Sequence, residues 1–369
     1  MKILPSAAVT AISLLFGLDY GHADIIYGNV LTTNQSAAGV RAYDANSVIL
    51  TGSRQVSGAT QGLVWKGSLQ TGVGQYYTLN LDIDGQTVTT SLYYGPNTSR
   101  YDPSLGAGNI RLVGSYKYLE GGSGNHGLIY SGELTGAGAW QELNVPSMLA
   151  SGTVANTIAH STMGDLAVGN YDLTTGGASS NAFIYNIAED SWTLFNLGGM
   201  ANMTSAYGIW QNGIGSDSYT IVGGSQHEGI NTGYLINYNT TSHSFGDAVY
   251  YDYGIGVTHF EGITGVDGGY NLIATTEDGA TFGFVPSDGD TYGTITWTVL
   301  NVPGSTLMTA NTIVDNIAIG VYSTAATEPD IQTYTATVPE PSVNALLVAS
   351  AGVAGFVVWR RRGSQKLSA

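Results

Sequence analysis

The sequence of 369 residues contains no cysteine and few charged side chains. Without cysteine the protein has no disulfide bond, no thiolate nucleophile and no cysteine-held zinc site. Charged residues make up 10% of the chain, and no lysine or arginine occurs between Lys117 and Arg360. The central part also lacks an amphipathic helical pattern, which argues against an α/β fold. The 52 glycines and 24 tyrosines, with 43% apolar residues, instead suit an exported β-rich protein.

The charge is unevenly distributed along the chain. Six of the 11 basic residues and 25 of the 27 acidic residues lie in residues 24–338, so this part carries a net charge of −19. Such a surface repels phosphate backbones and anionic lipids, which excludes nucleic-acid binding and membrane adhesion through basic patches. Divalent cations and neutral glycans are compatible partners.

The first 23 residues have the pattern of a secretory signal peptide. Lys2 precedes an apolar run from Ala7 to Leu18, and the small-x-small triplet Gly21-His22-Ala23 follows. We expect export through the Sec translocon and cleavage after Ala23. The alternative is an N-terminal core helix, which the order of basic, apolar and small residues disfavours.

The C-terminal residues predict a single transmembrane helix. Val343 to Trp359 are 17 residues without a charge, and Arg360, Arg361 and Arg362 follow directly. The length is at the lower limit for a spanning helix, and the arginines orient it so that the preceding chain lies outside the cytoplasm. A buried soluble helix is the alternative, but such a helix needs a polar face and this segment has none.

Residues 339–369 resemble the PEP-CTERM sorting signal of Gram-negative bacteria. The resemblance is carried by the motif Pro339-Glu340-Pro341, the membrane helix 343–359 and the basic cluster Arg360 to Arg362. It implies an inner-membrane-anchored precursor that an exosortase processes, and a mature protein at the cell surface or outside the cell. Members of this family commonly accompany exopolysaccharide and biofilm systems. Gly363 to Ala369 extend past the arginines, a mild departure from the pattern. The resemblance indicates a destination and no activity.

The segment from 24 to 338 contains internal repeats. Short apolar strands recur and end at a small residue, and these anchor residues are spaced by 62, 55, 54, 51 and 46 positions. The anchors are Gly52, Gly114, Gly169, Gly223, Ala274 and Gly320. After each comes a polar turn and a second strand with an aromatic residue, as in Gly62 to Trp65. A third strand follows in most units, and Trp-x-x-Leu-Asn-Val-Pro appears at 140–146 and again at 297–303.

These repeats predict an all-β propeller of about six blades. A further short segment precedes each anchor, so each unit of roughly 50 residues has four strands, which is kelch-like. A β-solenoid has shorter coils and tandem sandwiches need longer domains, while five or seven blades stay open. The last unit lacks an outer strand after Tyr334, and we expect Ile25 to Gly28 to supply it.

No catalytic, metal or cofactor site is predicted from the motifs. The histidines His126, His160, His227, His243 and His259 show no metal-binding or nucleophile spacing. His227-Glu228 and His259 with Glu261 are candidates to meet at the central opening. A solvated loop histidine is the favoured interpretation for each of them, since a lone histidine needs no functional explanation.

Two acidic turns and several aromatic residues have alternative interpretations. Asp82-Ile83-Asp84-Gly85 and Asp288-Gly289-Asp290 offer carboxylates to calcium, but Asp-Gly is above all a hairpin turn pair and no EF-hand pattern follows. Calcium therefore stays an alternative to the turn. Tyr76, Tyr77, Tyr93 and Tyr94 have the chemistry to stack on sugars, although blade packing explains strand aromatics better.

Three functions stay open after the sequence is read. The first is a non-enzymatic exported surface or extracellular-matrix protein associated with exopolysaccharide, in which the propeller is a rigid platform. The second is a glycan-binding module, which predicts exposed aromatics on one face. The third is a secreted polysaccharide hydrolase or lyase, which predicts several acids or a His–acid pair in the channel. Regular repeats without an interrupting motif favour the first.

Overall fold

The computed structural model describes residues 24–339 apart from 84, 86, 120–123, 175–179, 199–202, 255, 290 and 325–330. The predicted signal peptide with Ala23 and the tail from Glu340, which includes Pro341, the helix 343–359 and Arg360 to Arg362, lie outside these residues. Within the described part, no helix has the length and hydropathy needed to cross a membrane. Residues Tyr27–Thr337 form one compact unit.

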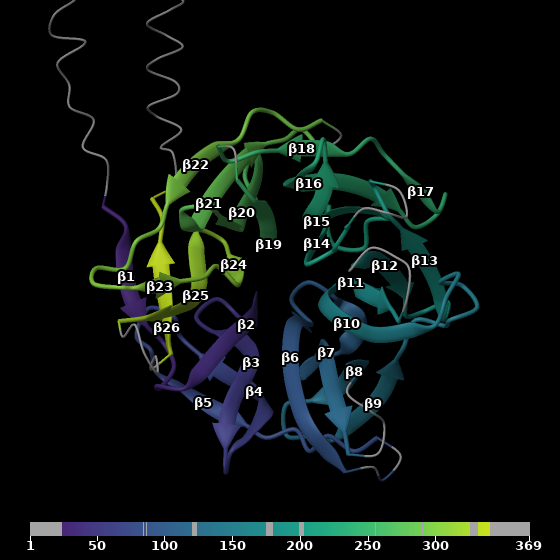
Figure 1. Ribbon diagram of the computed structural model, residues 1–369. Helices are drawn as coiled ribbons and strands as arrows, with labels where there is room; N and C mark the ends of the chain where they lie inside the picture. Colours follow the sequence, from purple (N-terminus) through teal and green to yellow (C-terminus); the bar gives the residue numbers. More distant parts are fainter. Residues whose placement is uncertain are drawn as a thin grey trace, which may run out of the picture. The chain divides into compact units, whose positions relative to one another are not determined.

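This unit is a ring of six antiparallel sheets, the blades, arranged around a central axis (Figure 1). The first three blades have the order β2-β3-β4-β5, β6-β7-β8-β9 and β10-β11-β12-β13. Their strands are β2 (Gln35–Ala42), β3 (Val48–Val56), β4 (Ala59–Gly67), β5 (Gly74–Tyr77), β6 (Val88–Thr98), β7 (Asn109–Tyr118), β8 (His126–Glu133), β9 (Gly138–Leu143), β10 (Val154–Met163), β11 (Leu166–Leu173), β12 (Asn181–Asn186) and β13 (Ser191–Phe195). A 3₁₀ turn, η1 (Pro103–Leu105), follows β6.

Blades four to six repeat this order with two broken strands. Their strands are β14 (Gly208–Gln211), β15 (Ser218–His227), β16 (Ile230–Asn239), β17 (Ser244–Phe245), β18 (Val249–Tyr251), β19 (Thr258–Val266), β20 (Gly269–Thr276), β21 (Gly279–Pro286), β22 (Thr296–Val299), β23 (Leu307–Met308), β24 (Thr312–Val314), β25 (Ile317–Ser323) and β26 (Gln332–Thr337). The sequence pattern of the fourth unit predicts one outer strand over Phe245 to Tyr251. The structure has two strands there, because one extra residue separates the pair Tyr238–Phe245 from the pair Leu235–Val249. The prediction of an all-β six-bladed propeller with four-stranded blades is confirmed.

The ring is closed by strands from the two ends of the chain. β1 (Ile26–Asn29) pairs with β26 and completes the sixth blade, as the sequence predicted for Ile25 to Gly28. In Figure 1 the purple β1 lies beside β26. Further bonds join the same parts of the chain: the Asn34 N–H donates to the Ile331 carbonyl (2.9 Å) and the Thr333 hydroxyl donates to the Gln35 carbonyl (2.9 Å).

Contacts between neighbouring blades supply the hydrophobic core. One buried cluster joins blades three and four, another joins blades one and two, and a third joins the first blade to the sixth through Leu50, Val314 and Ile319. The Trp-x-x-Leu-Asn-Val-Pro repeat serves this packing, because Leu143 and Val145 are buried between the second and third blades. Stability therefore comes from stacked repeats, which replace the missing disulfides.

In every blade the innermost chain segment has one extra residue relative to its partner strand at the level of the channel, and β6 and β10 each have a second one near their first residue. The pairing register shifts by one residue between Ala37 and Gly39 in the first blade and between Ala159 and Ser161 in the third. The same one-residue bulge occurs in the other four blades. At a bulge, two residues of one strand lie opposite a single residue of the partner strand. The side chain of the extra residue therefore points in a direction that regular pairing would not give it.

The repeated anchor glycines lie opposite these bulges. A Cβ atom at Gly52 would lie 1.8 Å from the Ser36 carbonyl oxygen, and one at Gly223 would lie 2.0 Å from the Ser205 carbonyl oxygen. Glycine leaves room for this close approach of a carbonyl that lies two residues before the bulge residue. In the fifth blade, where the anchor is Ala274, the residue pairs with Phe260 directly before the bulge. The small anchor residue that recurs in the sequence therefore marks the position opposite the bulge.

Candidate functional site

The bulges aim one residue of each blade into the central channel. Six bulge residues surround a pocket of about 250 Å³. They are Ala38, Tyr94, His160, Tyr207, Glu261 and Asn311, and Ser36, Ser53 and Leu92 complete the lining. We call this space the channel pocket. Because the six strands contribute equivalent positions, the pocket belongs to the repeat architecture itself, and bulges are frequent next to functional sites.

The channel is nearly closed directly beside the channel pocket. The inner strands come together there and leave a space of about 10 Å³. Gly95 shows how tight this level is, since a Cβ atom at this position would lie 2.6 Å from the Ser161 Cα. The buried Arg41 side chain follows along the channel and donates to the Ile209 carbonyl (3.0 Å). The channel pocket therefore has one closed end.

Aromatic rings form one wall of the channel pocket. The His160 ring stacks on Tyr207 with 3.7 Å between ring centroids, and Tyr94 lies 4.7 Å from His160 on a tilted plane. His160 Nε2 is 2.6 Å from the Asn170 side-chain oxygen, so this nitrogen carries a proton and donates it. Tyr207 in turn meets the edge of His259 at 4.5 Å. The rings support one another and hold the wall rigid.

A chain of three polar side chains lies behind this wall. The Ser205 hydroxyl is 2.7 Å from His259 Nε2, and His259 Nδ1 is 3.2 Å from the Glu261 carboxylate. Since the carboxylate only accepts hydrogen bonds, Nδ1 carries a proton, while the Ser205 hydroxyl bonds Nε2 and also lies 3.3 Å from the Gly224 carbonyl oxygen. His259 and Glu261 are two residues apart on β19, and Ser205 comes from the preceding blade. The result is a fixed orientation for the Glu261 carboxylate.

The order serine, histidine and acid matches that of a nucleophilic triad, but the serine is enclosed. Ser205 is 5% exposed, and its hydroxyl oxygen also accepts from the Gly224 N–H at 3.2 Å. A nucleophile needs an open approach for the substrate and oxyanion donors beside it. Only Glu261 of the three lines the channel pocket. The geometry therefore makes Ser205 and His259 supports for Glu261.

Burial fixes the charges in the channel pocket. Burial lowers the pKa of His160 to about 3, opposed in part by the hydrogen bond to Asn170, so His160 is neutral at pH 7. Burial, and next the charge of Glu261, raise the pKa of Tyr94 to about 12. The pKa of Tyr207 rises for the same two reasons. Glu261 is the only carboxylate among the lining residues, and no lysine or arginine lines the pocket.

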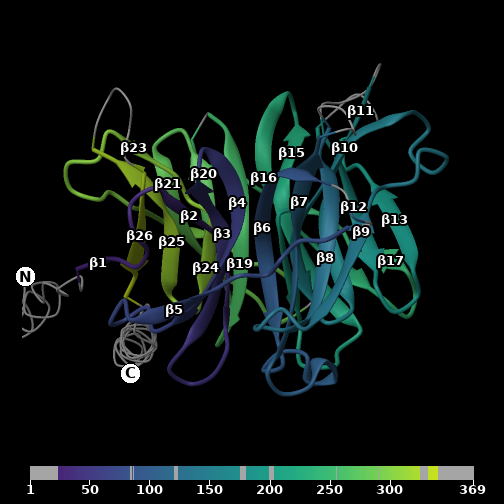
Figure 2. The ribbon, with the colours of Figure 1, turned by 90° about the horizontal axis from the view of Figure 1, so that it is seen from below.

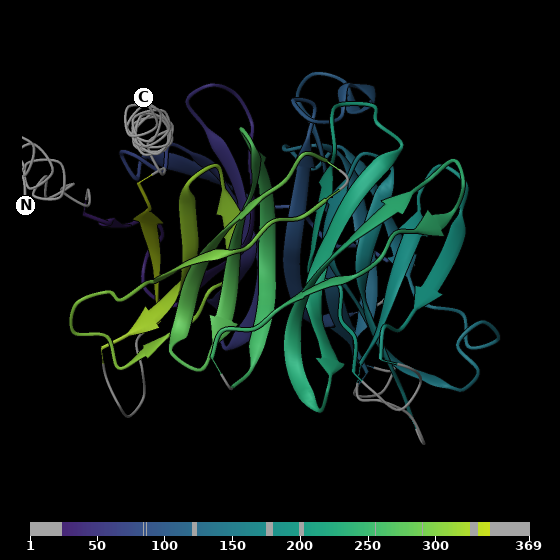
Figure 3. The same cartoon turned by 90° about the horizontal axis from the view of Figure 1, so that it is seen from above.

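A second, larger pocket lies where the inner strands end. It has a volume of about 620 Å³ and is lined by Tyr101, Trp210, Asp267 and Tyr270 among others. We call it the exit pocket, since Met163 and Gln211, the last residues of β10 and β14, lie in its wall. The Arg41 guanidinium faces the Trp210 ring at 5.7 Å. The channel pocket is lined by the bulge residues, and the exit pocket includes the last residues of β10 and β14; Figures 2 and 3 show the strands of the ring edge-on.

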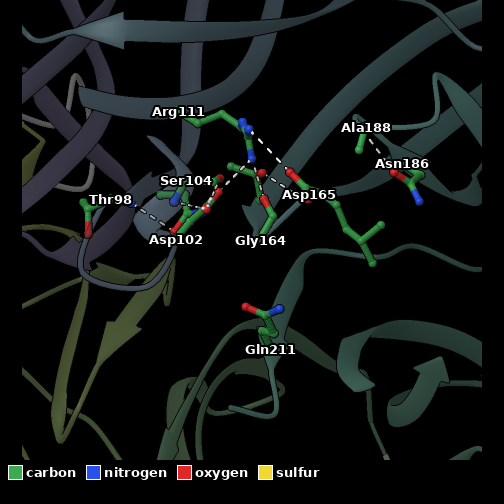
Figure 4. A network of polar contacts seen from close by, with 12 residues as sticks. Thr98, Asp102, Ser104, Arg111, Gly164, Asp165, Asn186, Ala188 and Gln211 are labelled. Atoms are coloured by element: carbon green, nitrogen blue, oxygen red, sulfur yellow. Dashed lines mark hydrogen bonds and ion pairs between the residues drawn. The ribbon is translucent and has the colours of Figure 1, made fainter. Parts of the chain in front are cut away.

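Arg111, which lies near the exit pocket, is engaged within the ring. Arg111 pairs with Asp102 at 3.2 Å and with Asp165 at 3.7 Å, and it also donates to the Gly164 carbonyl (Figure 4). Asp102 accepts from the Ser104 N–H at 3.1 Å and caps η1. This network joins the second blade to the third. Because Nη1 is engaged by Asp102 and Gly164 and Nη2 by Asp165, we do not assign Arg111 as an anion site.

The other histidines named from the sequence have structural surroundings. His126 Nδ1 bonds the Asn144 amide at 2.9 Å and its ring packs on Tyr118. His227 stacks on Tyr250 at 3.9 Å, so it does not join His259 and Glu261 at the channel. His243 lies in a turn with a φ of 50°. Only His160 and His259 reach the channel.

The acidic turns and candidate tyrosines also have assigned places. The Gly85 N–H donates to Asp82 at 3.1 Å and the Thr291 N–H donates to Asp288 at 2.9 Å, which are turn-type hydrogen bonds. Asp84 and Asp290 lie outside the described residues. Among those described, no group of three or more His, Asp or Glu side chains is placed to hold a metal ion.

Tyrosines named as sugar-stacking candidates are divided between the core and the channel. Tyr93 is buried in the core between the first two blades, Tyr76 donates to Gln35 at 2.7 Å, and Tyr77 packs against the same core. Tyr94 alone reaches the channel pocket. Tyr76 is the one aromatic among the exposed large apolar side chains of the described residues. A face of exposed aromatics, which a glycan-binding module was expected to show, is not formed by them.

Sequence reasoning named His259 with Glu261 as a pair for the central opening, and it named His160 and Tyr94 singly, but it missed the other residues of the site. Tyr207 and Asn311 were not candidates, and Ser205 carried no motif. No spacing signal marks these residues. The six bulge residues lie 14, 20, 9, 16, 13 and 9 positions before their anchors, so counting back from an anchor does not find them.

Comparisons with known proteins identify the tail and the fold. The model of the PEP-CTERM protein-sorting motif matches residues 337–362. Among curated proteins no match was found. A solved luciferin-regenerating enzyme has a TM-score of 0.50 at 10% identity, over 85% of this chain and 95% of its own. This likeness shows the fold alone.

Two further solved structures are more distant. A Thermus protein described as an oxidoreductase (glucose dehydrogenase) has a TM-score of 0.47 at 10% identity, over 85% of this chain and 100% of its own. A glycoside hydrolase has a TM-score of 0.43 at 9% identity, over 92% and 96%. Neither carries an argument about activity. The chain is a six-bladed β-propeller with a PEP-CTERM sorting motif at its C-terminus, and the motif implies an exported protein that an exosortase processes.

Proposed function

We propose that the mature protein is a non-enzymatic surface or extracellular-matrix protein associated with exopolysaccharide, and that its channel pocket binds a glycan end. The observation that carries the binding role is the convergence of six bulge residues on one polar pocket. A pocket of about 250 Å³ is smaller than drug-sized sites, which suits one sugar unit. Hydroxyl and amide groups of Ser36, Ser53 and Asn311 supply hydrogen bonds, and the aromatic wall supplies stacking.

The alternative of a polysaccharide hydrolase or lyase draws support from the His259–Glu261 pair in the channel. Glycoside hydrolysis usually needs two carboxylates across the scissile bond, and Glu261 is the only one in the lining. His160 is held neutral by burial and has no second acid beside it. These observations favour binding over catalysis.

The binding role is tested by filling the channel pocket. We expect the protein expressed in its native host to be retained on the host's purified exopolysaccharide, and Ser36→Phe to abolish retention because the ring occupies the pocket. Ile214→Phe, at an exposed position of the exit pocket, is the matched control and should be retained like the wild type. Full retention of Ser36→Phe, or no retention of the wild type, contradicts the proposal.

The processing is tested by the intact mass of the protein from the cell envelope and the medium. We propose that Ala23 precedes the signal cleavage site, that Pro339-Glu340-Pro341 is the exosortase motif and that Arg360 to Arg362 form the cytoplasmic stop of a membrane helix over 343–359. A species from Asp24 to about Pro339 is then expected. A species that keeps Val343 to Ala369 would show a permanently membrane-tethered protein instead.

A further inference from the structure

We propose that the channel pocket recognises an amino sugar through its protonated amine, with Glu261 as the counter-ion. This inference rests on the proposed function, since it assumes that the pocket takes a sugar unit. It adds the chemical class of that sugar, which neither the sorting motif nor the fold supplies.

The charge of the channel pocket is unbalanced. Glu261 is the only charged side chain among the lining residues, because His160 is neutral at pH 7 and both tyrosines keep their protons. In the described residues, the only ion-pair partner within reach of Glu261 is His259, whose proton on Nδ1 it accepts at 3.2 Å. The lining itself contains no lysine or arginine to face the carboxylate, and a cationic ligand would supply that charge.

The carboxylate is also held in place and partly removed from water. The Glu261 side chain is 17% exposed, and that of His259 is 14% exposed. The Ser205–His259 bond fixes the imidazole, which fixes one carboxylate oxygen. A counter-ion that enters such a site meets a preoriented partner at lower effective dielectric than in water. Charge-assisted hydrogen bonds are the stronger kind.

The aromatic wall suits the same ligand. The His160 ring stacks on Tyr207 and is tilted against Tyr94, and Tyr207 meets the edge of His259. An ammonium group over such rings gains a cation–π contribution, and the apolar face of a sugar ring gains contact area. The serine and asparagine side chains of the lining match sugar hydroxyls. A sugar with a primary amine can interact with the carboxylate, the aromatic rings and the hydroxyl and amide side chains of the pocket.

A bare divalent metal ion fits the site less well. Calcium takes six to eight oxygen ligands, usually several carboxylates, and the channel pocket offers one carboxylate. An N-acetylated sugar has no charge for Glu261, and it would leave the carboxylate buried and unpaired. The expected order of affinity is therefore glucosamine above glucose and N-acetylglucosamine.

The test is calorimetric titration of the protein, expressed in its native host, with glucosamine, glucose, N-acetylglucosamine and ethanolamine. Glu261→Gln keeps the shape and an acceptor for His259, and removes the charge. We expect it to weaken glucosamine binding at least tenfold and to leave glucose binding unchanged. Asp267→Asn removes the same charge from the exit pocket and should bind like the wild type. Thermal unfolding midpoints confirm that both variants fold.

Each outcome decides one part of the inference. Equal binding of glucose and glucosamine, or wild-type glucosamine affinity in Glu261→Gln, overturns the amine recognition and leaves the glycan role standing. No binding of any sugar overturns the proposed function, and the inference with it. Ethanolamine binding as tightly as glucosamine supports the counter-ion role and contradicts recognition of the sugar. Equal loss in Asp267→Asn shows general electrostatic attraction and contradicts the site.

Discussion

Leu31 is the side chain through which we would test ring closure. It lies directly after β1, is 9% exposed, and packs in the cluster that joins the first blade to Val314 and Ile319 of the sixth. β1 itself is mostly exposed, and its hydrogen bonds include one from the Asn301 N–H to the Tyr27 hydroxyl at 2.8 Å. The apolar contacts that close the ring are therefore made just behind the strand that completes the blade.

The expected magnitude follows from burial. A Leu→Ala change at a buried site costs about 2–5 kcal/mol, and we take about 3 kcal/mol for Leu31→Ala. The unfolding entropy of about 2.1 cal/mol/K per residue gives roughly 0.6 kcal/mol/K for a ring of about 300 residues, so the midpoint should fall by about 5 °C. Deleting residues 24–29 removes exposed hydrogen bonds of about 1 kcal/mol each, and should lower it by about half as much.

The assay is thermal unfolding followed by circular dichroism, with the full chain in every case. Leu149→Ala is the matched control, because Leu149 is 51% exposed and its loss should change the midpoint by less than about 1 °C. If Leu31→Ala has the same unfolding midpoint as the control, or if the deletion lowers the midpoint more than Leu31→Ala does, then ring closure does not depend on the apolar contacts between the first and sixth blades and this reasoning is wrong.

Three other predictions concern the channel. Gly95→Ala should lower the unfolding midpoint by several degrees, since its Cβ would lie 2.6 Å from the Ser161 Cα. Gly246→Ala is the control, because its Cβ would lie 3.6 Å from the nearest atom and should not lower the midpoint. Equal midpoints of the two variants would contradict the close packing of the inner strands beside the channel pocket. Ser205→Ala should leave any hydrolysis of a p-nitrophenyl ester at the wild-type rate, and a loss of turnover would identify a nucleophile after all. The pKa of about 3 for His160 lies below its unfolded value, so stability should fall as pH drops from 6.5 towards 3, because only the unfolded chain takes up this proton. His160→Gln should show a smaller loss in urea unfolding between about pH 7.5 and 5.5, and an unchanged loss would assign the effect elsewhere.

The fold could be predicted from the sequence because a glycine recurs at the equivalent position of most repeats. A Cβ atom at an anchor such as Gly169 would lie 2.0 Å from the Ile158 carbonyl oxygen, so glycine is favoured at this position and recurs in five of the six units. The supply of the last outer strand by the N-terminus also followed from counting strands. The break within Phe245 to Tyr251 did not, since a single extra residue in an outer strand leaves no compositional mark.

The site was harder to predict because it is assembled across blades. His259 and Glu261 were visible as a pair, two residues apart on one strand, where side chains share a face. Ser205 is 54 residues earlier and meets His259 only because adjacent blades stack in the ring. The lining residues differ from blade to blade in size and chemistry, so no repeat signal marks them. Repetition reveals the scaffold and conceals the positions at which its copies diverge.

At the bulges, the residues that must fit the core and the residues that face the channel are different positions of the sequence. Residues such as Ala159 and Phe260 beside the bulges are fully buried and must fit the core, whereas the extra residue that follows each of them faces the channel. Substitution at the six bulge positions can therefore change the ligand without repacking a blade. In evolutionary terms the propeller offers an interchangeable combination of six side chains on a constant frame, so relatives with the same ring are expected to differ first at Ala38, Tyr94, His160, Tyr207, Glu261 and Asn311.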